Sequence, residues 1–171
     1  VSTINTENTT NMKSMFQGCQ KITELDVTGF NTSNVTDMES MFNYCATLIE
    51  LDLSSFDTSN VTNMKFMFFS CDRIIELDLS SFDTSNVINM NSMFGYMLSV
   101  REINLSTFNT SKVTDMSSMF YRNNNLQNLN LSGFDTSNVT SMGAMFFDCC
   151  YGLNVLDISN FDTSKVTNMS N

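Results

Sequence analysis

The stretch FDTSNVTNM, from Phe56 to Met64, decides how this chain folds, because near copies of it recur at regular intervals. The copies begin at Phe82, Phe108, Phe134 and Phe161. The first three intervals are 26 residues and the last is 27, with the extra residue near Cys149 and Cys150. Self-similarity at a fixed period of this length is typical of repeat architectures, in which each copy is one structural unit.

The period divides the 171 residues into six complete units that start at residues 11, 37, 63, 89, 115 and 141. The residues before 11 align with the end of a unit, and those from 168 onward begin another. We therefore expect residues 1–171 to form a single repeat array with a partial unit at each end. We also expect the array to be a fragment of a longer protein.

Aligning the units places most methionines and phenylalanines in columns. Thirteen of the 14 methionines fall into two columns, which pass through Met38 and Met41, and 12 of the 15 phenylalanines fall into two others. A Met-rich chain can bind soft metals or present an adaptable groove. Strict repetition at the same positions favours the simpler interpretation, in which these side chains pack in a shared core.

Local patterns predict one strand in each unit. In LIELDLSSF, residues 48–56, Leu51 and Leu53 alternate with Glu50 and Asp52. This period of two is typical of a strand with one buried face and one solvent-exposed face.

The segment VTNMKFMFFSC, residues 61–71, has apolar residues at i, i+3, i+6 and i+7, which predicts a short amphipathic helix. Thr36 and Glu39 form a capping box at the equivalent place one unit earlier. A helix of about two turns is marginal alone, so it would have to dock on the strand layer. The intervening Asp-Thr-Ser-Asn is turn chemistry, because these side chains hydrogen-bond to nearby backbone groups.

A strand, a turn and a short helix cannot bury their apolar faces alone, whereas stacked copies share a continuous core. The predicted fold is therefore of the α/β class. It is a solenoid of about six 26-residue units, with a parallel β-sheet on one face and short helices or helical turns on the other.

The unit L-x-x-L-D-L-S-x-F-D-T-S-N-V-T-N-M-x-x-M-F-x-x-C resembles the 26-residue repeat of bacterial surface proteins, a relative of the leucine-rich repeat found in BspA-like adhesins and lipoproteins. The resemblance covers essentially the whole chain and implies a leucine-rich-repeat-like solenoid on an exported, cell-surface protein with a role in adhesion. It brings no catalytic residues with it. The chain departs from the pattern where Met97 and Asn123 replace Cys, and where Asn104 and Asn130 replace Asp.

Composition argues against catalysis and nucleic-acid binding. The chain has no histidine, the usual base beside a Ser or Cys nucleophile, and its Ser and Thr residues recur in every turn. A net charge of −10 and the lack of a basic stripe oppose nucleic-acid binding. We expect no enzyme activity, no cofactor and no metal site of the zinc type, and no apolar run is long enough to span a membrane.

The five cysteines are predicted to have a structural role. Cys19, Cys45 and Cys71 share one column and are expected to be small buried hydrophobic residues. Parallel stacking does not favour the side-chain directions that a disulfide between adjacent turns requires. The sequence leaves open whether Cys149 and Cys150 form a vicinal disulfide.

The outward strand positions form the candidate binding face. Like charges stacked on adjacent strands are destabilising, so an acidic ladder is either a solvated face that resists aggregation or a surface that binds a partner. Carboxylates and amide oxygens also suit calcium, although no loop has a calcium-binding signature, so calcium affinity should be weak. The candidate partner-binding residues are Glu24, Asp26, Glu50, Asp52, Glu76, Asp78, Glu102, Asn104, Asn128 and Asn130.

Sequons for N-linked glycans also recur in the turns, for example NTS at Asn31 and NVT at Asn34. In a eukaryotic secreted protein they could carry glycans. In a bacterial surface protein they are simply the turn, which is the interpretation that we favour.

The sequence thus predicts a non-catalytic, extracellular recognition or adhesion module that is attached to the cell surface. Its partner would be a protein or glycan on a host or neighbouring cell, bound through the sheet face. The alternative is a structural stalk or filament subunit that stacks end to end.

Overall fold

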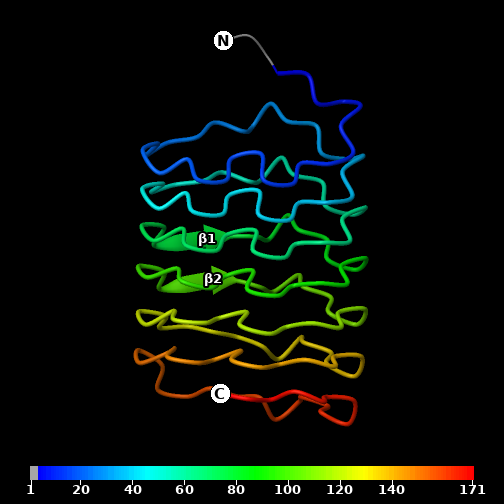
Figure 1. Cartoon of the computed structure of the whole chain (residues 1–171), viewed down its shortest axis with the longest axis vertical. Helices are drawn as coiled ribbons and strands as arrows, with labels where there is room; N and C mark the ends of the chain where they lie inside the picture. The colour runs from blue at the N-terminus through cyan, green and yellow to red at the C-terminus, as the bar shows by residue number, and fades with distance from the viewer. Residues whose placement is uncertain (1–3) are drawn as a thin grey trace.

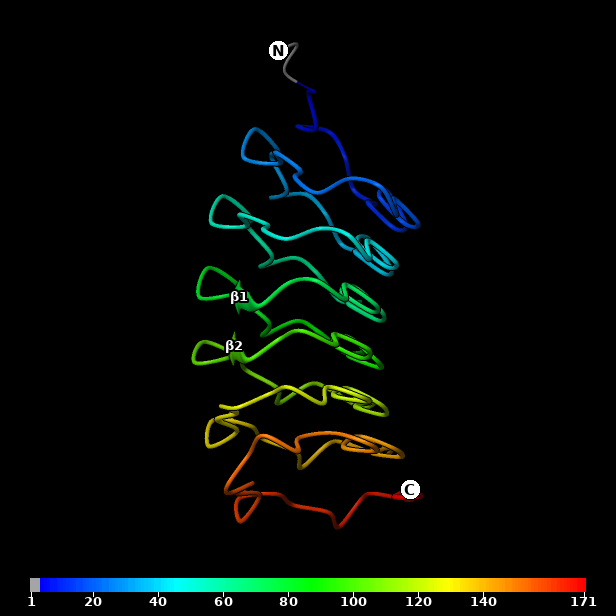
Figure 2. The ribbon, with the colours of Figure 1, turned by 90° about the vertical axis from the view of Figure 1, so that its left-hand side faces the viewer.

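The structure, a computed structural model, describes residues 4–171. Figures 1 and 2 show flattened turns of the chain stacked along the long axis, with the first described turn at one end and the last at the other. Residues 1–3, predicted to belong to the first partial unit, lie outside the described residues.

Regular secondary structure is almost absent. Residues 4–171 contain two β-strands, β1 (Glu76–Asp78) and β2 (Glu102–Asn104), and no α-helix. The two strands pair in parallel, with Glu76 opposite Glu102, and lie in neighbouring turns (Figure 1). The predicted α/β solenoid, with a sheet on one face and helices on the other, is therefore wrong, because most of the described chain is coil.

Isolated parallel bridges join most turns instead of a continuous sheet. They link residues 26 or 27 positions apart, such as Asp37 with Asn63 and Ser141 with Asn168. The predicted strand over residues 48–56 is reduced to one such bridge, between Glu24 and Glu50. The period-two pattern was correct about which side chains face outward, but it did not show that the backbone pairs at single points.

The predicted helix is replaced by consecutive tight turns. Alternate amides of residues 38–44 donate to carbonyl oxygens 25 residues later, as Ser40 does to Lys65 at 2.8 Å. Of the amides between them, those of Met41 and Asn43 bond three residues back, as Met41 does to Met38 at 3.2 Å, and that of Glu39 bonds to the Asp37 side chain at 2.9 Å. These bonds to the following turn recur with the same polarity in most of the stack.

This series of tight turns needs residues in the left-handed backbone conformation. The backbone φ is +57° at Ser40 and +60° at Tyr44, and the equivalent residues of neighbouring units also have positive φ. Such residues cannot continue a right-handed helix. The short segment is a marginal helix alone, and pairing with the next turn satisfies its amides instead. The i, i+3 spacing marks the residues that tight turns direct into the core.

The turn threonine of each unit from Thr6 to Thr136 is buried and connects two turns. The Thr84 hydroxyl donates to the carbonyl oxygen of Asn109 at 3.0 Å and accepts from the Asn109 amide at 2.8 Å. Both bonds recur at Thr6, Thr32, Thr58, Thr110 and Thr136. A side chain thus takes the place of a backbone bridge at each turn. The turn assignment from sequence was right, but it missed this bond to the neighbouring unit.

The core consists of the predicted methionine and phenylalanine columns. Every column methionine from Met38 to Met145 is buried, which confirms the prediction of core packing for these residues. Rings of the column from Phe16 to Phe146 stack nearly parallel, with centroids 5.7 to 5.9 Å apart between successive turns. Apolar side chains therefore pack against their own counterparts in the next turn.

The Thr84 bridge can be tested by substitution. We expect Thr84→Val to lower the free energy of unfolding by about 1–3 kcal/mol, because the amide and carbonyl of Asn109 lose their partner. Thr163→Val is the matched control: Thr163 is exposed and makes no side-chain hydrogen bond among the described residues, so its loss should stay within about 0.5 kcal/mol. Denaturant unfolding measures both, and equal losses would contradict the bridge.

The left-handed turns give a second prediction. Ala144 has a φ of +54°, where a Cβ atom is unfavourable. We therefore expect Ala144→Gly to be neutral or stabilising by up to about 1 kcal/mol. Ala46 has no such φ, so Ala46→Gly should destabilise by about 0.4–1 kcal/mol through the greater freedom of the unfolded chain. Thermal unfolding compares the two, and the same sign at both sites would contradict the left-handed conformation.

Candidate functional site

The predicted binding residues form two parallel rows on one face. We call Glu24, Glu50, Glu76, Glu102 and Asn128 the glutamate row, and Asp26, Asp52, Asp78, Asn104 and Asn130 the aspartate row. All ten side chains are exposed except that of Asn104, which is partly buried. Bridges and strand pairing set Glu24 opposite Glu50, and Glu102 opposite both Glu76 and Asn128. The structure thus brings the predicted residues together.

The glutamate row makes no internal polar contacts. None of its five side chains takes part in a hydrogen bond or ion pair within residues 4–171. Four carboxylates therefore lie on successive turns without an internal countercharge. Stacked like charges repel, so this row reduces stability unless counterions or a partner offset it.

The aspartate row has a structural role that the sequence interpretation missed. Each side chain accepts a hydrogen bond from the amide two residues later, as Asp52 does from Ser54 at 2.9 Å. These bonds close the turns that follow the bridges. Asn104 and Asn130 make the same bond through a neutral oxygen. The interchange of Asp and Asn in this column was the sequence signal that charge is not its main role.

Turn hydrogen bonds also lower several aspartate pKa values. The side chain of Ser85, followed by its backbone amide, lowers the pKa of Asp83. Ser54 has the same effect on the pKa of Asp52, again through its side chain and then its amide. These groups are therefore firmly ionised at neutral pH.

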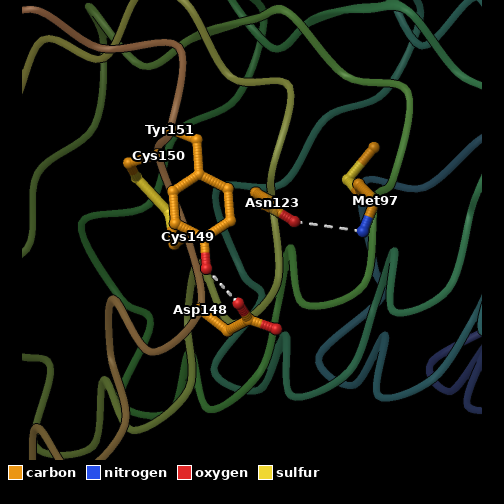
Figure 3. The surroundings of a disulfide bond; sticks show 6 residues. All are labelled: Met97, Asn123, Asp148, Cys149, Cys150 and Tyr151. Atoms are coloured by element: carbon orange, nitrogen blue, oxygen red, sulfur yellow. Dashed lines mark hydrogen bonds between the residues drawn. A yellow bond between two sulfur atoms is a disulfide. The ribbon is translucent and has the colours of Figure 1, made fainter.

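The irregular unit contains a vicinal disulfide, Cys149–Cys150 (Figure 3). The sequence left this bond open. The amide of Cys150 donates to the carbonyl oxygen of Asn123 at 3.2 Å. The Asn123 side chain in turn accepts from the Met97 amide at 3.0 Å, and the Tyr151 hydroxyl bonds to Asp148 (Figure 3). The insertion is thus accommodated by a closed ring beside the regular cysteine column.

Of the three cysteines predicted to be buried, Cys45 and Cys71 confirm the prediction, whereas Cys19 is only partly buried. Cys45 and Cys71 are buried, and their thiols donate to the carbonyls of Phe16 and Phe42 in the preceding turns, both at 3.2 Å. Burial raises the pKa of Cys45 to about 11 and that of Cys71 well above its usual value. Both remain protonated thiols at neutral pH, which makes them poor nucleophiles.

An aromatic stripe runs along another part of the surface, and the sequence analysis did not single it out. Its rings contact one another across successive turns with centroids 5.3 to 5.8 Å apart, and Arg122 lies over two of them. The stripe consists of Tyr44, Phe69, Tyr96, Tyr121 and Phe147. Two adjacent alignment columns contain these residues, but their variation from unit to unit hid them from a search for invariant positions.

Two of the NVT sequon asparagines already have a structural role. The side-chain amides of Asn60 and Asn138 donate to the carbonyls of Ser33 and Ser111 in the preceding turn, both at 2.8 Å. A glycan on this nitrogen would interrupt these contacts. The turn interpretation is therefore consistent with the geometry.

The described residues contain neither a metal-holding cluster nor a membrane-spanning helix. Across residues 4–171, no cluster of three or more His, Cys, Asp or Glu side chains has the arrangement to hold a metal ion. The described chain also has no helix with the length and apolar character to cross a bilayer.

A periodic chain of stacked 26-residue turns defines a repeat protein. Two matches to one protein-family model, described as "Mycoplasma protein of unknown function, DUF285", cover residues 1–103 and 96–171. They span the whole chain together, and the chain belongs to this family. Comparisons with curated proteins and with solved structures found no match. The family match supports the predicted resemblance in coarse terms, as a bacterial surface-repeat family.

The lowered aspartate pKa values give a prediction about pH. A carboxyl whose folded pKa is depressed contributes stability above its unfolded value of about 3.9 and loses it as the pH falls through the folded value. We therefore expect Asp83→Asn/Asp135→Asn to be somewhat less stable than wild type at pH 7, because asparagine keeps the turn bond but not the contribution of the charge. Below about pH 4 the variant should lose less stability than wild type.

Urea unfolding at several pH values measures this difference. Asp83→Ala/Asp135→Ala is the control, since it removes the turn acceptor and should be less stable already at pH 7. Parallel curves for wild type and the asparagine variant from pH 7 to pH 2.5 would contradict a stabilising role for the charge.

Proposed function

We propose that this chain is a non-catalytic recognition or adhesion module of a cell surface, which binds a protein or glycan through the glutamate row. The observation that carries the proposal is the row itself, with exposed carboxylates on four successive turns and no internal partner. A protein tolerates such repulsion most readily where a ligand offsets it. The aspartate row would frame this surface and fix its turns.

The absence of catalysis is part of the proposal. The chain has no histidine, and the Asp-Thr-Ser threonines through Thr136 use their hydroxyls both as donor and as acceptor within the stack. The buried thiols of Cys45 and Cys71 have raised pKa values. These observations favour binding over nucleophilic chemistry.

We further propose that the module is extracellular and attached to a bacterial surface, as a relative of BspA-like adhesins and lipoproteins. The resemblance of the repeat and the coarse family match support this location. Calcium would act weakly, by bridging the glutamate row to acidic groups of a partner, because the described residues offer no metal-holding cluster of their own.

The alternative function is a structural stalk or filament subunit that stacks end to end. The hydrogen bonds between successive turns, such as that from the Ser40 amide to the Lys65 carbonyl, are of a kind that stacked copies could repeat between them. This alternative predicts open-ended assembly, whereas the recognition module would stay monomeric and bind a ligand saturably.

Binding of the labelled chain to an immobilised extracellular-matrix preparation tests the main proposal. We expect saturable binding by wild type and its loss in Glu24→Gln/Glu50→Gln/Glu76→Gln/Glu102→Gln. The control variant is Asp57→Asn/Asp83→Asn/Asp135→Asn/Asp162→Asn, which also removes four charges. It does so at a turn position where two other units already have asparagine, Asn31 and Asn109. It should bind like wild type.

Equal losses of binding in the two variants would show that binding depends on net charge alone, and would contradict the proposed binding face. Sedimentation velocity over a range of concentrations separates the alternative, since polymers that lengthen with concentration would favour the filament subunit.

A further inference from the structure

The binding face is interrupted between its second and third turns. Parallel bridges join Glu24 with Glu50 and Glu102 with Asn128, and β1 pairs with β2, but no bridge joins Glu50 with Glu76 in the described chain. A hollow of about 510 Å³ lies at this point. Its lining residues are Ile49, Glu50, Leu51, Asp52, Ile75, Glu76 and Asp78.

The backbone at the hollow keeps unused hydrogen-bonding groups. The Ile49 amide donates to the Thr23 carbonyl at 3.1 Å, and the Ile75 carbonyl accepts from the Arg101 amide at 2.8 Å. Each isoleucine is therefore paired with the turn that lies away from the hollow. On the inner side, no backbone hydrogen bond links residues 49–52 with residues 75–78 of the described structure. The Ile75 amide and the Ile49 carbonyl therefore have no backbone hydrogen-bond partner within residues 4–171.

The walls of the hollow are apolar and its rim is acidic. Ile49 and Ile75 are each 44% exposed, although their neighbours in sequence, Leu48 and Ile74, are completely buried. Glu50 and Glu76 flank this isoleucine pair without any internal hydrogen bond or ion pair. An apolar surface beside two unpaired carboxylates suits a side chain that has an aliphatic stem and a cationic end.

A second hollow on the other side of the isoleucine pair has the opposite charge. It measures about 380 Å³ and is lined by Ile49, Arg73, Ile75, Ser99, Arg101, Asn125 and Gln127. Neither arginine forms an ion pair within residues 4–171. The charge of the surface thus changes sign across the isoleucine pair. A bare metal ion would use neither the apolar walls nor the arginines, whereas a peptide with basic, apolar and acidic side chains would use all three.

We propose that the hollow between Glu50 and Glu76 anchors a lysine or arginine side chain from an extended segment of a partner protein. The stem of that side chain lies on Ile49 and Ile75, and its cation lies between the two glutamates. The Ile75 amide and Ile49 carbonyl hold the segment's backbone, and Arg73 and Arg101 receive a neighbouring carboxylate. This inference rests on the proposed function and specifies the partner as a protein.

Fluorescence anisotropy at physiological ionic strength tests the anchor, with the 171-residue chain and a fluorescein-labelled peptide of alternating lysine and leucine as the probe. We expect saturable binding by wild type. Glu50→Gln/Glu76→Gln and, separately, Ile49→Ser/Ile75→Ser should each weaken it at least about tenfold, a loss of about 1.4 kcal/mol. The control, Asp57→Asn/Asp162→Asn, removes two charges outside the hollow and outside the glutamate row, and should change affinity less than twofold.

Several outcomes would overturn the anchor. They are equal weakening by the control pair, no effect of the isoleucine substitutions, or displacement of the probe by millimolar CaCl₂ but not by NaCl of the same ionic strength. Failure of the probe to bind the wild-type chain would also overturn it. Because the matrix assay does not use this probe, saturable matrix binding that depends on the glutamate row would leave the proposed function standing in each case. Circular dichroism of every variant confirms that it is folded.

Discussion

The structure depends on hydrogen bonds between one turn of the chain and the next. With almost no regular secondary structure, the backbone cannot satisfy its polar groups within a helix or a wide sheet. Alternate amides of the tight-turn segment bond to the following turn, and threonine hydroxyls such as that of Thr84 supply a further donor and acceptor where the backbone has none. The repeat period follows from this requirement, because each donor must find its acceptor at the same place in the next copy.

The sequence predicted what lies inside the molecule better than how the backbone runs. Identical apolar residues at a constant spacing are informative because stacked copies must place them together, and the methionine and phenylalanine columns are indeed buried from Phe30 to Met145. The same spacing was wrongly interpreted as a helix. Apolar positions three and four residues apart occur both on a helix face and in successive tight turns, and the left-handed φ of residues such as Ser40 and Tyr44 has no clear signature in non-glycine residues.

The sequence also predicted only part of the candidate site. The outward positions were found from their alternation with leucine, and the structure places all ten on one face. The sequence could not show that Asp52 and its equivalents close turns while Glu50 and its equivalents make no internal contact. The repeat pattern also could not predict that Glu50 and Glu76 lack the bridge found between other turns. Alignment of repeats reports the average unit, whereas the features that distinguish one part of this surface from another are departures from that average.

The uniform direction of the bonds in the tight-turn segments has an electrical consequence. In these segments the amides of each turn point toward the following turn, and the carbonyls that accept them point back. The aligned peptide dipoles therefore add along the long axis, much as they do in a helix. This polarity is confined to the tight-turn segments, because amides elsewhere in the turn, such as those of Thr36 and Ile49, donate to the preceding turn. Within the tight-turn segments a second copy could continue the pattern only head to tail, since like ends would bring donor against donor or acceptor against acceptor.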